Sequence, residues 1–239
     1  MKNTLITGAN KGIGFETARL LAQRGYFVFM GSRDERRGRD AIHRLKDQDI
    51  QNVDLLLIDV TRIDSIREAR QELETRIDAL DLLINNAAIA GPQPQHIATI
   101  DMKDLRDVFE TNFFGAIQTT QQFLPMLDRS PNPMIINVSS ELGSLTRHSS
   151  PQRNPNWDLY DAYGSSKTAL NAFTVALANA YRDTKFRINS VTPGFSATDL
   201  NGFQGLQTAE QGADYIVNFV TRGADAPTGK FFKEEPLAW

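Results

Sequence analysis

The stretch TGANKGIG at residues 7–14 lies between an apolar segment of strand composition and a segment of helical period. Its three glycines, Gly8, Gly12 and Gly14, stand at relative positions 1, 5 and 7. Glycine permits positive φ and close backbone approach, and the free N–H groups at a helix start attract an anion such as a pyrophosphate. The stretch predicts a strand–turn–helix unit that holds phosphate groups, although by itself it could be only a tight turn.

Short apolar runs rich in branched residues alternate with stretches of helical period along the rest of the chain, which is typical of βαβ units around a parallel sheet. We expect an α/β fold, a single doubly wound domain over residues 1–239 with a six- to seven-stranded parallel sheet. The expected strands are Thr4–Thr7, Tyr26–Met30, Val53–Ile58, Leu80–Asn85, Met134–Ser139, Phe186–Thr192 and, if there is a seventh, Gly229–Phe232; helices are expected after Ile13 and at about 34–46, 62–78, 101–128, 161–181 and 208–219.

The composition excludes several classes of function. The chain has no cysteine, which removes disulfides, thiolate metal sites and cysteine nucleophiles. A formal net charge of −3 provides no basic surplus for nucleic acid, and the apolar runs are far shorter than the ~20 residues that span a bilayer. The three histidines have no metal-ligand spacing. With a strand expected almost at Met1, no signal peptide fits, so we expect a cytoplasmic protein without nucleic-acid, membrane or metal partners.

Two loops interrupt the alternation of strands and helices. Residues 91–98 follow the fourth expected strand, and residues 143–161, which include Trp157, separate the fifth strand from its helix. Both loops follow the carboxyl ends of strands, and that edge is where open α/β sheets bind ligands. We expect the functional site there.

Further short motifs follow residues 7–14 in a fixed order. They are Asp59-Val60 after the third expected strand, NNAA at 85–88, Asn112, NVSS at 137–140, YGSSK at 163–167, and Pro193-Gly194 with Thr198. This ordered set, over residues 7–198, resembles the short-chain dehydrogenase/reductase family, particularly its NADPH-dependent carbonyl reductases. The resemblance implies a Rossmann fold with cofactor contacts at Gly8, Asn10, Lys11, Gly12, Ile13, Gly14, Arg33, Asp59, Val60, Asn85, Asn86, Ala87, Tyr163, Lys167, Pro193, Gly194 and Thr198.

The end of the second expected strand favours NADP(H). Family members that use NAD carry an acid at the position of Ser32, whereas Arg33 beside it can bind a 2′-phosphate through charge-assisted hydrogen bonds. Lys11 adds a second cation. The alternative is that Asp34 binds the ribose of NAD(H); we expect Asp34 or Ser32 instead to cap the helix that begins near Glu35.

The pattern Y-x-x-x-K occurs twice, at Tyr163 with Lys167 and at Tyr181 with Lys185. The two tyrosines are 18 residues apart, about 27 Å along one helix, so Tyr181 is expected at the far edge of the sheet as a packing residue. Tyr163 and Lys167 are neighbours at i and i+4, and we expect the ammonium to lower the pKa of the phenol.

Ser140 is the expected catalytic serine, because it precedes x-x-G as the serine of the family does. Its hydroxyl can hydrogen-bond a substrate oxygen. The gap to Tyr163 is longer than is usual in the family, and the extra segment, 144–161, resembles in place the insertion of monomeric carbonyl reductases. We hypothesise that it covers the substrate cleft with Trp157 as an apolar wall; the alternative is a surface loop.

The resemblance implies hydride transfer between NADPH and a small ketone or aldehyde. Tyr163 would donate the proton, Lys167 would bind the nicotinamide ribose, Ser140 would orient the carbonyl and Asn112 would position a water. The alternatives are an NAD-dependent alcohol dehydrogenase with the same residues and a catalytically silent NADP-binding sensor. Because the insertion can obstruct the helix packing through which family members associate, we expect a monomer or homodimer.

Overall fold

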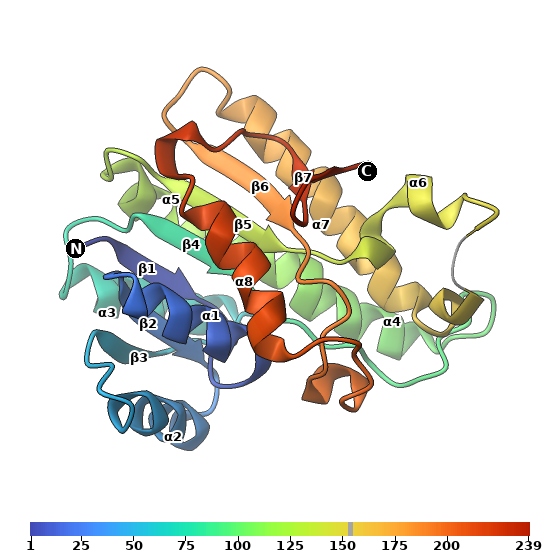
Figure 1. The fold of residues 1–239 in the computed structure, drawn as a ribbon, viewed down its shortest axis with the longest axis horizontal. Helices are drawn as coiled ribbons and strands as arrows, with labels where there is room; N and C mark the ends of the chain where they lie inside the picture. Colours follow the sequence, from blue (N-terminus) through green and yellow to red (C-terminus); the bar gives the residue numbers. More distant parts are fainter. Residues whose placement is uncertain (153–154) are drawn as a thin grey trace.

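The computed structural model describes residues 1–152 and 155–239, and it forms one sheet between two layers of helices (Figure 1). The strands are β1 (Asn3–Ile6), β2 (Phe27–Ser32), β3 (Val53–Leu57), β4 (Leu82–Asn85), β5 (Met134–Val138), β6 (Arg187–Val191), β7 (Phe231–Phe232) and β8 (Pro236–Leu237). The helices are α1 (Gly12–Gln23), α2 (Glu35–Lys46), α3 (Ile63–Glu74), α4 (Met102–Phe109), α5 (Gly115–Asp128), α6 (Leu145–His148), α7 (Asp161–Ala180) and α8 (Ala209–Val220).

The strand order is β3-β2-β1-β4-β5-β6-β7-β8, which confirms the doubly wound α/β fold. The first seven strands are parallel, as expected, and the sheet has in addition an eighth strand, β8, which was not expected and pairs antiparallel with β7. A two-residue strand that includes Pro236 carries no periodicity of its own. A tight turn, closed by the hydrogen bond from Lys233 N to Glu235 O, brings it back alongside β7.

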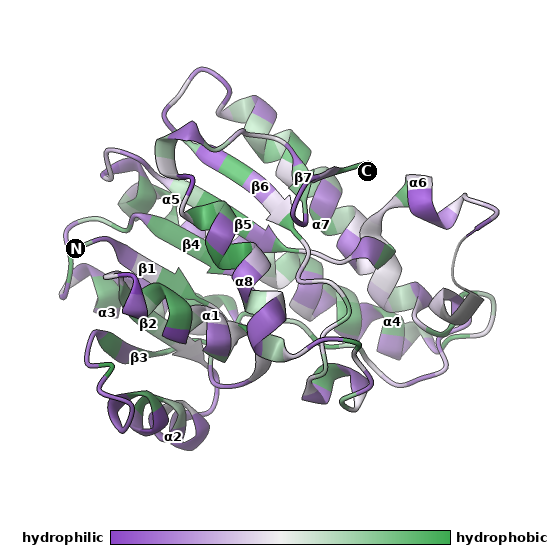
Figure 2. Cartoon of the chain, in the orientation of Figure 1, coloured by the Kyte–Doolittle hydropathy of each residue, from purple (hydrophilic) through white to green (hydrophobic). Residues whose placement is uncertain are grey.

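Alternate side chains of the strands enter two separate cores. Ile6 packs under α1, α2 and α8 on one face, while the adjacent Leu5 packs under α3, α5 and α7 on the other. This is the period-two alternation of a strand buried on both faces. Figure 2 shows the result: the strands are largely hydrophobic, and the polar residues lie on the outer sides of the helices.

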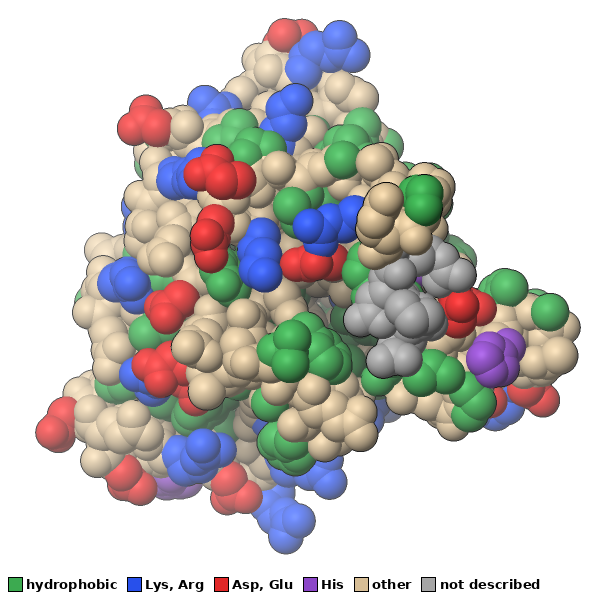
Figure 3. Space-filling model, turned by 45° about the vertical axis from the view of Figure 1, so that its right-hand side comes forward, with side chains coloured by type: hydrophobic (Ala, Val, Ile, Leu, Met, Phe, Trp, Pro, Cys, Tyr) green, Lys and Arg blue, Asp and Glu red, His purple; other side chains and the backbone are tan. Residues whose placement is uncertain are grey.

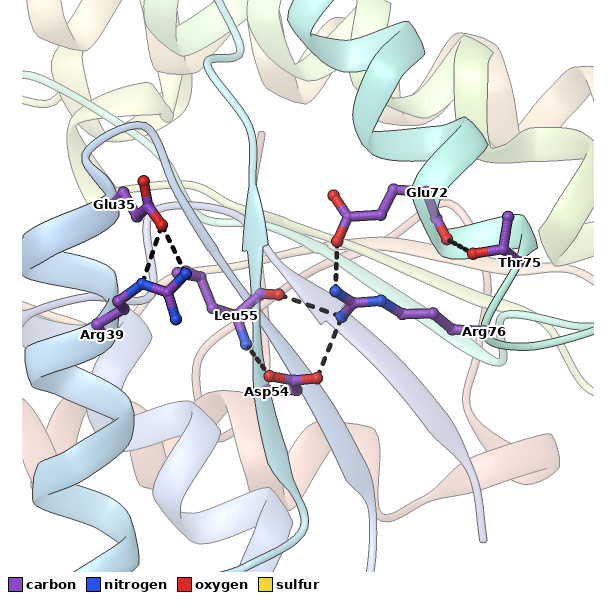
Figure 4. Close-up of polar contacts among 7 residues, drawn as sticks. All are labelled: Glu35, Arg39, Asp54, Leu55, Glu72, Thr75 and Arg76. Carbon is purple, nitrogen blue, oxygen red and sulfur yellow. Dashed lines mark hydrogen bonds and ion pairs between the residues drawn. The ribbon is translucent and has the colours of Figure 1, made fainter.

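The outer edge of β3 is covered by charged side chains (Figure 4). Arg76, which follows α3, donates to Leu55 O and to the carboxylate of Asp54, both at 3.2 Å, and also pairs with Glu72. An unpaired strand edge can template pairing with another chain, and an arginine bound to its carbonyl discourages this.

The long helix expected at 101–128 is divided into α4 and α5 by a π-helical turn, Glu110–Phe114. The expected helix at 62–78 ends earlier, at Glu74. No helix in the described residues is both long enough and apolar enough to cross a membrane.

Candidate active site

A cavity of about 1040 Å³ opens at the carboxyl ends of the strands, where the sequence predicts the site. Its size is at the upper end for a ligand site, so an extended ligand fits. Of the residues predicted for the site, those that line the cavity are Gly8, Asn10, Lys11, Gly12, Ile13, Gly14, Arg33, Asp59, Val60, Asn86, Ala87, Ser140, Tyr163, Lys167, Pro193, Gly194 and Thr198.

The glycine turn forms a cradle in which side chains would not fit. Gly8 and Gly12 have φ of 64° and 57°, and a Cβ on Gly14 would lie 2.4 Å from Asn86 Nδ2 and 2.6 Å from Gly8 O. No side chain caps the start of α1, because Lys11 at the N-cap makes no capping hydrogen bond. The turn therefore presents backbone N–H groups at a helix N-terminus, which fits the phosphates of a dinucleotide.

Cations surround the end of the cavity next to β2. Arg33 is exposed, lines the cavity, and has no ion-pair partner among residues 1–152 and 155–239. Asp34 accepts a hydrogen bond from Arg37 N at 2.9 Å, which confirms it as the N-cap of α2. Lys11 pairs with Asp199 at 2.7 Å, an acid that the sequence did not suggest.

The segment after β4 is hydrogen-bonded to the glycine turn. Asn86 donates from Nδ2 to Thr7 O and Gly8 O at 2.8 and 3.1 Å, and its backbone N–H donates to Thr7 Oγ1. Asn85 does not line the cavity: its buried Nδ2 donates to Thr120 and Asn137 in the protein interior. The predicted cofactor contact at Asn85 therefore has no support from its side-chain contacts, because the carboxamide is turned toward β5 and α5.

Ser140, Tyr163 and Lys167 converge at the other end of the cavity. The Ser140 side chain lies close enough to that of Tyr163 to influence the pKa of its hydroxyl. Ser140 Oγ accepts from Leu142 N at 3.2 Å, which fixes the serine at the start of a 3-10 turn. Lys167 Nζ donates to Val138 O at 2.8 Å and lies 5.6 Å from the centre of the Tyr163 ring.

The electrostatics of this group differ from the expectation. Burial raises the pKa of Tyr163 to about 12, opposed by the nearby Ser140 side chain, and burial lowers the pKa of Lys167 to about 7. Tyr163 keeps part of its surface open to the cleft, but its hydroxyl is desolvated. Desolvation disfavours both charged forms, so in the protein alone the lysine does not lower the pKa of the tyrosine below its usual value.

Asn112 lies in the π-helical turn and is 1% exposed. Its Oδ1 accepts from Ile89 N, and its Nδ2 donates to Ile89 O and to Ser166 Oγ. The side chain does not line the cavity, so the prediction that it positions a water is not supported by its side-chain contacts. It ties the segment after β4 to α7.

The duplicated Y-x-x-x-K pattern is resolved as predicted. Tyr181 follows the end of α7 and packs against the Phe186 ring at 4.6 Å. Lys185 donates to Asp128 O at 2.7 Å. Neither residue lines the cavity, because α7 carries them to the opposite edge of the sheet.

The predicted insertion at 144–161 contributes α6 and a 3-10 turn at Pro155–Leu159; its residues 153 and 154 lie outside the described residues. Trp157 lines the cavity and packs against His148, with the ring centres 5.0 Å apart and the ring planes tilted by 48°. The loop at 91–98 also approaches this end, since Gln95 N donates to Leu159 O at 3.0 Å.

Several lining residues were missed by sequence reasoning. Lys233, from the turn before β8, reaches Glu141 Oε1 at 3.4 Å, and Glu141 also pairs with Arg147. After β6, the lining residues include Phe195 and Leu206, which are 48% and 93% exposed. Hydrophobic side chains gather near the middle of the face drawn in Figure 3. No local motif marks the missed lining residues, because they reach the cavity through contacts between segments that are distant in the sequence.

The profile of the short chain dehydrogenase family matches residues 2–208. A (+)-neomenthol dehydrogenase of Capsicum annuum is 32% identical over 98% of this chain and 96% of that protein. That alignment has 304 positions, so at least 304 − 239 = 65 positions of the relative have no counterpart in this chain. A salutaridine reductase of Papaver bracteatum is 28% identical over 97% of this chain and 94% of that protein.

Two solved structures share the fold over nearly the whole chain. An NADPH-bound carbonyl reductase from chicken fatty liver superposes with a TM-score of 0.85 at 27% identity, covering 100% of this chain and 99% of that one. The salutaridine reductase of Papaver somniferum has the same TM-score and identity, covering 97% of this chain and 99% of that one.

Proposed function

Since the chain belongs to the short-chain dehydrogenase family of oxidoreductases, we propose that it reduces a small ketone or aldehyde with NADPH, using Tyr163 as general acid. One observation carries the proposal. Ser140, Tyr163 and Lys167 lie together at one end of a cleft whose other end has an open helix N-terminus and cations. Such a cleft can hold a dinucleotide along its length and a carbonyl at the buried end.

The residues suited to hold the dinucleotide are those of the glycine turn, with Thr198 opposite. The Thr198 side chain lies 3.5 Å from where a Cβ on Gly12 would stand, so the two segments lie close together at the wall of the cleft. Asn86 and Ala87 line the cleft next to the turn, and Pro193-Gly194, beside Lys233, lines it in the proposed nicotinamide region. NADPH, when bound, supplies the hydride that reduces the carbonyl carbon.

The protein's own groups handle the proton. Ser140 hydrogen-bonds the substrate oxygen, and Tyr163 gives its hydroxyl proton to that oxygen as it becomes an alcohol. With its pKa raised to about 12, the phenol is fully protonated at neutral pH, which suits an acid in the reduction. Lys167 is then the cation nearest to the phenolate left behind.

Two contacts favour NADPH over NADH. Asp34, the candidate ribose acid, already caps α2, and the Ser32 hydroxyl donates to Asp34 O at 2.8 Å. Arg33 is left as an exposed cation on the cleft wall, suited to a 2′-phosphate. The carbonyl reductase of the same fold was solved with NADPH.

We propose further that residues 1–239 form one catalytic domain, acting as a monomer or homodimer, and that the segment 144–161 covers the substrate end. Trp157 on the cavity wall supports this last point. An apolar wall selects for apolar flanks on the carbonyl compound.

The test is consumption of NADPH and NADH, followed by absorbance, with a panel of aldehydes, ketones and quinones. We expect turnover with NADPH and little with NADH. Turnover only with NADH would favour the NAD-dependent alcohol dehydrogenase. Tight NADPH binding with no turnover of any compound would favour the catalytically silent sensor.

A further inference from the structure

We propose that Gln95, in the loop after β4, is a positioning residue that holds Tyr163 in place for proton transfer; this rests on the proposed function of Tyr163. Gln95 does not line the cavity and touches no position where the carbonyl or the cofactor would lie. It acts through the backbone at the start of α7. The loop and that end of the helix lie at the same side of the molecule (Figure 1).

The burial of Gln95 is exceptional for its surroundings. It is 0% exposed, whereas every other residue from 92 to 99 is exposed. Burying a carboxamide costs free energy unless its polar atoms are bonded, so a lone buried glutamine in an exposed loop indicates a built contact. Space is made for it by Gly91, where a Cβ would lie 2.7 Å from Gln95 Nε2.

Gln95 caps α7 from outside the helix. The residue at the helix N-cap, Tyr160, makes no side-chain capping bond, and the first N–H groups of any helix lack partners within it. Gln95 Oε1 accepts from Tyr163 N at 3.1 Å, and Gln95 O accepts from Asp161 N at 3.3 Å. A further hydrogen bond joins the loop to the helix, with the loop as the donor, because Ile97 N donates to the Asp161 carboxylate at 2.8 Å.

The same side chain also reaches the cavity wall. Gln95 Nε2 donates to Ala90 O at 2.5 Å, and Ala90 lines the cavity. The carbonyl of Tyr163 is held separately, since it accepts from Ser166 Oγ at 2.7 Å and that hydroxyl accepts from Asn112. Two carboxamides thus link residues 89–90 to the backbone of Tyr163, Gln95 at its N–H and Asn112, through Ser166, at its C=O. The tyrosine is fixed relative to the wall rather than only to its own helix.

Loss of this link should affect the chemical step and not cofactor binding. Tyr163 lies in the first turn of α7, where helix ends fray most readily, and a misplacement of ~1 Å can cost about 100-fold in rate. The glycine turn and Arg33 are on other elements and do not contact Gln95. We therefore expect a change in kcat with little change in KM or in the Kd of NADPH.

The experiment compares Gln95→Met, which keeps the shape and removes both side-chain bonds, with Gln95→Glu, which keeps an acceptor for Tyr163 N. The matched control is Asn52→Leu. The Asn52 carboxamide likewise makes two hydrogen bonds to the backbone, donating to Ala22 O and Tyr26 O at 2.7 and 2.5 Å, but on elements that carry no reacting group. Measurements are kcat and KM with the panel compound reduced fastest, the Kd of NADPH, Tm, and hydrogen exchange of residues 160–166.

We expect Gln95→Met to lower kcat about 10- to 100-fold with KM and Kd within twofold, and Gln95→Glu to recover part of kcat. A kcat within threefold of the parent, or an equal loss in Asn52→Leu, would overturn the proposal. If the parent protein reduces no carbonyl compound, the proposed function fails. Hydrogen exchange of residues 160–166 then tests the positioning role of Gln95 separately. Faster exchange at residues 160–166 in Gln95→Met then supports the positioning role, and unchanged exchange overturns it.

Discussion

The two ends of the cleft differ in how far their charged groups are buried. At the proposed reaction end, Lys167 is 2% exposed and its ammonium donates to Val138 O. At the proposed cofactor end, the Lys11 and Asp199 side chains are 56% and 47% exposed, and Arg33 is exposed as well. Water and salt can replace a lost group at the exposed end but not at the buried end. Substitutions should therefore have large, specific effects at one end and small, graded ones at the other.

The largest effect is expected from Tyr163→Phe. Removing the hydroxyl removes the proton donor, and we expect kcat to fall about 10²- to 10⁴-fold while the Kd of NADPH changes little. Tyr181→Phe, in the duplicated pattern, should leave kcat unchanged. Steady-state kinetics with the panel compound reduced fastest would measure both. If the Tyr163→Phe variant retained a tenth of the activity, the effect at the buried end would be no larger than those expected at the exposed end, and the contrast would fail.

The second prediction concerns the stability of the cofactor-free protein. In the folded protein the pKa of Lys167 is lowered to about 7, whereas in the unfolded chain it is ~10.4. Between pH 7 and 9 the unfolded state therefore binds more protons, and the free energy of unfolding rises with pH, by about 2 kcal/mol. Lys167→Met should abolish this rise, and Lys185→Met should retain it. Urea unfolding at pH 7 and pH 9 measures the change in the free energy of unfolding. An equal change in the parent protein and in both variants would contradict the prediction.

At the exposed end, Arg33→Ala should raise the Kd of NADPH about tenfold at low salt and leave the Kd of NADH within twofold, because one charge-assisted contact is lost. The difference should shrink as salt screens it. Arg36→Ala is the matched control, since Arg36 is also exposed but does not line the cavity. Fluorescence titration measures both cofactors. Equal losses for NADPH and NADH would defeat the assignment of a 2′-phosphate site.

The smallest effect is expected from Asp199→Asn. It releases Lys11 from an exposed ion pair of 2.7 Å, and such pairs contribute about 0.2–1 kcal/mol. The Kd of NADPH should fall about two- to threefold and that of NADH should not change. Weaker binding of both cofactors would mean instead that the pair holds the two walls of the cleft together.

The fold could be predicted well from local patterns. Each of the first six strands lies within two residues of its expected bounds, because strand and helix periodicity is a short-range property. The exceptions are elements without a pattern of their own. The π-helical turn at Glu110–Phe114 sits inside a continuous helical period, and β8 exists only because β7 offers it an edge.

The site could be predicted in part. The motifs that follow the strands meet at one edge, as parallel strands require, and most of them line the cavity. The directions of the Asn85 and Asn112 side chains could not be predicted, because they depend on partners such as Thr120 and Ser166 far along the chain. Gln95 carried no signal for the same reason, since it contacts Tyr163 across 68 residues.

By itself, the sequence determined the order of strands and helices, the glycine turn, and which tyrosine and lysine stand together, since all of these depend on neighbours within a few residues. Only the tertiary structure decided that Tyr163 and Lys167 are both desolvated, that Lys11 faces Asp199, and that a glutamine from another loop caps α7. Burial and electrostatics are set by what distant segments bring to a point in space, and no local pattern encodes that.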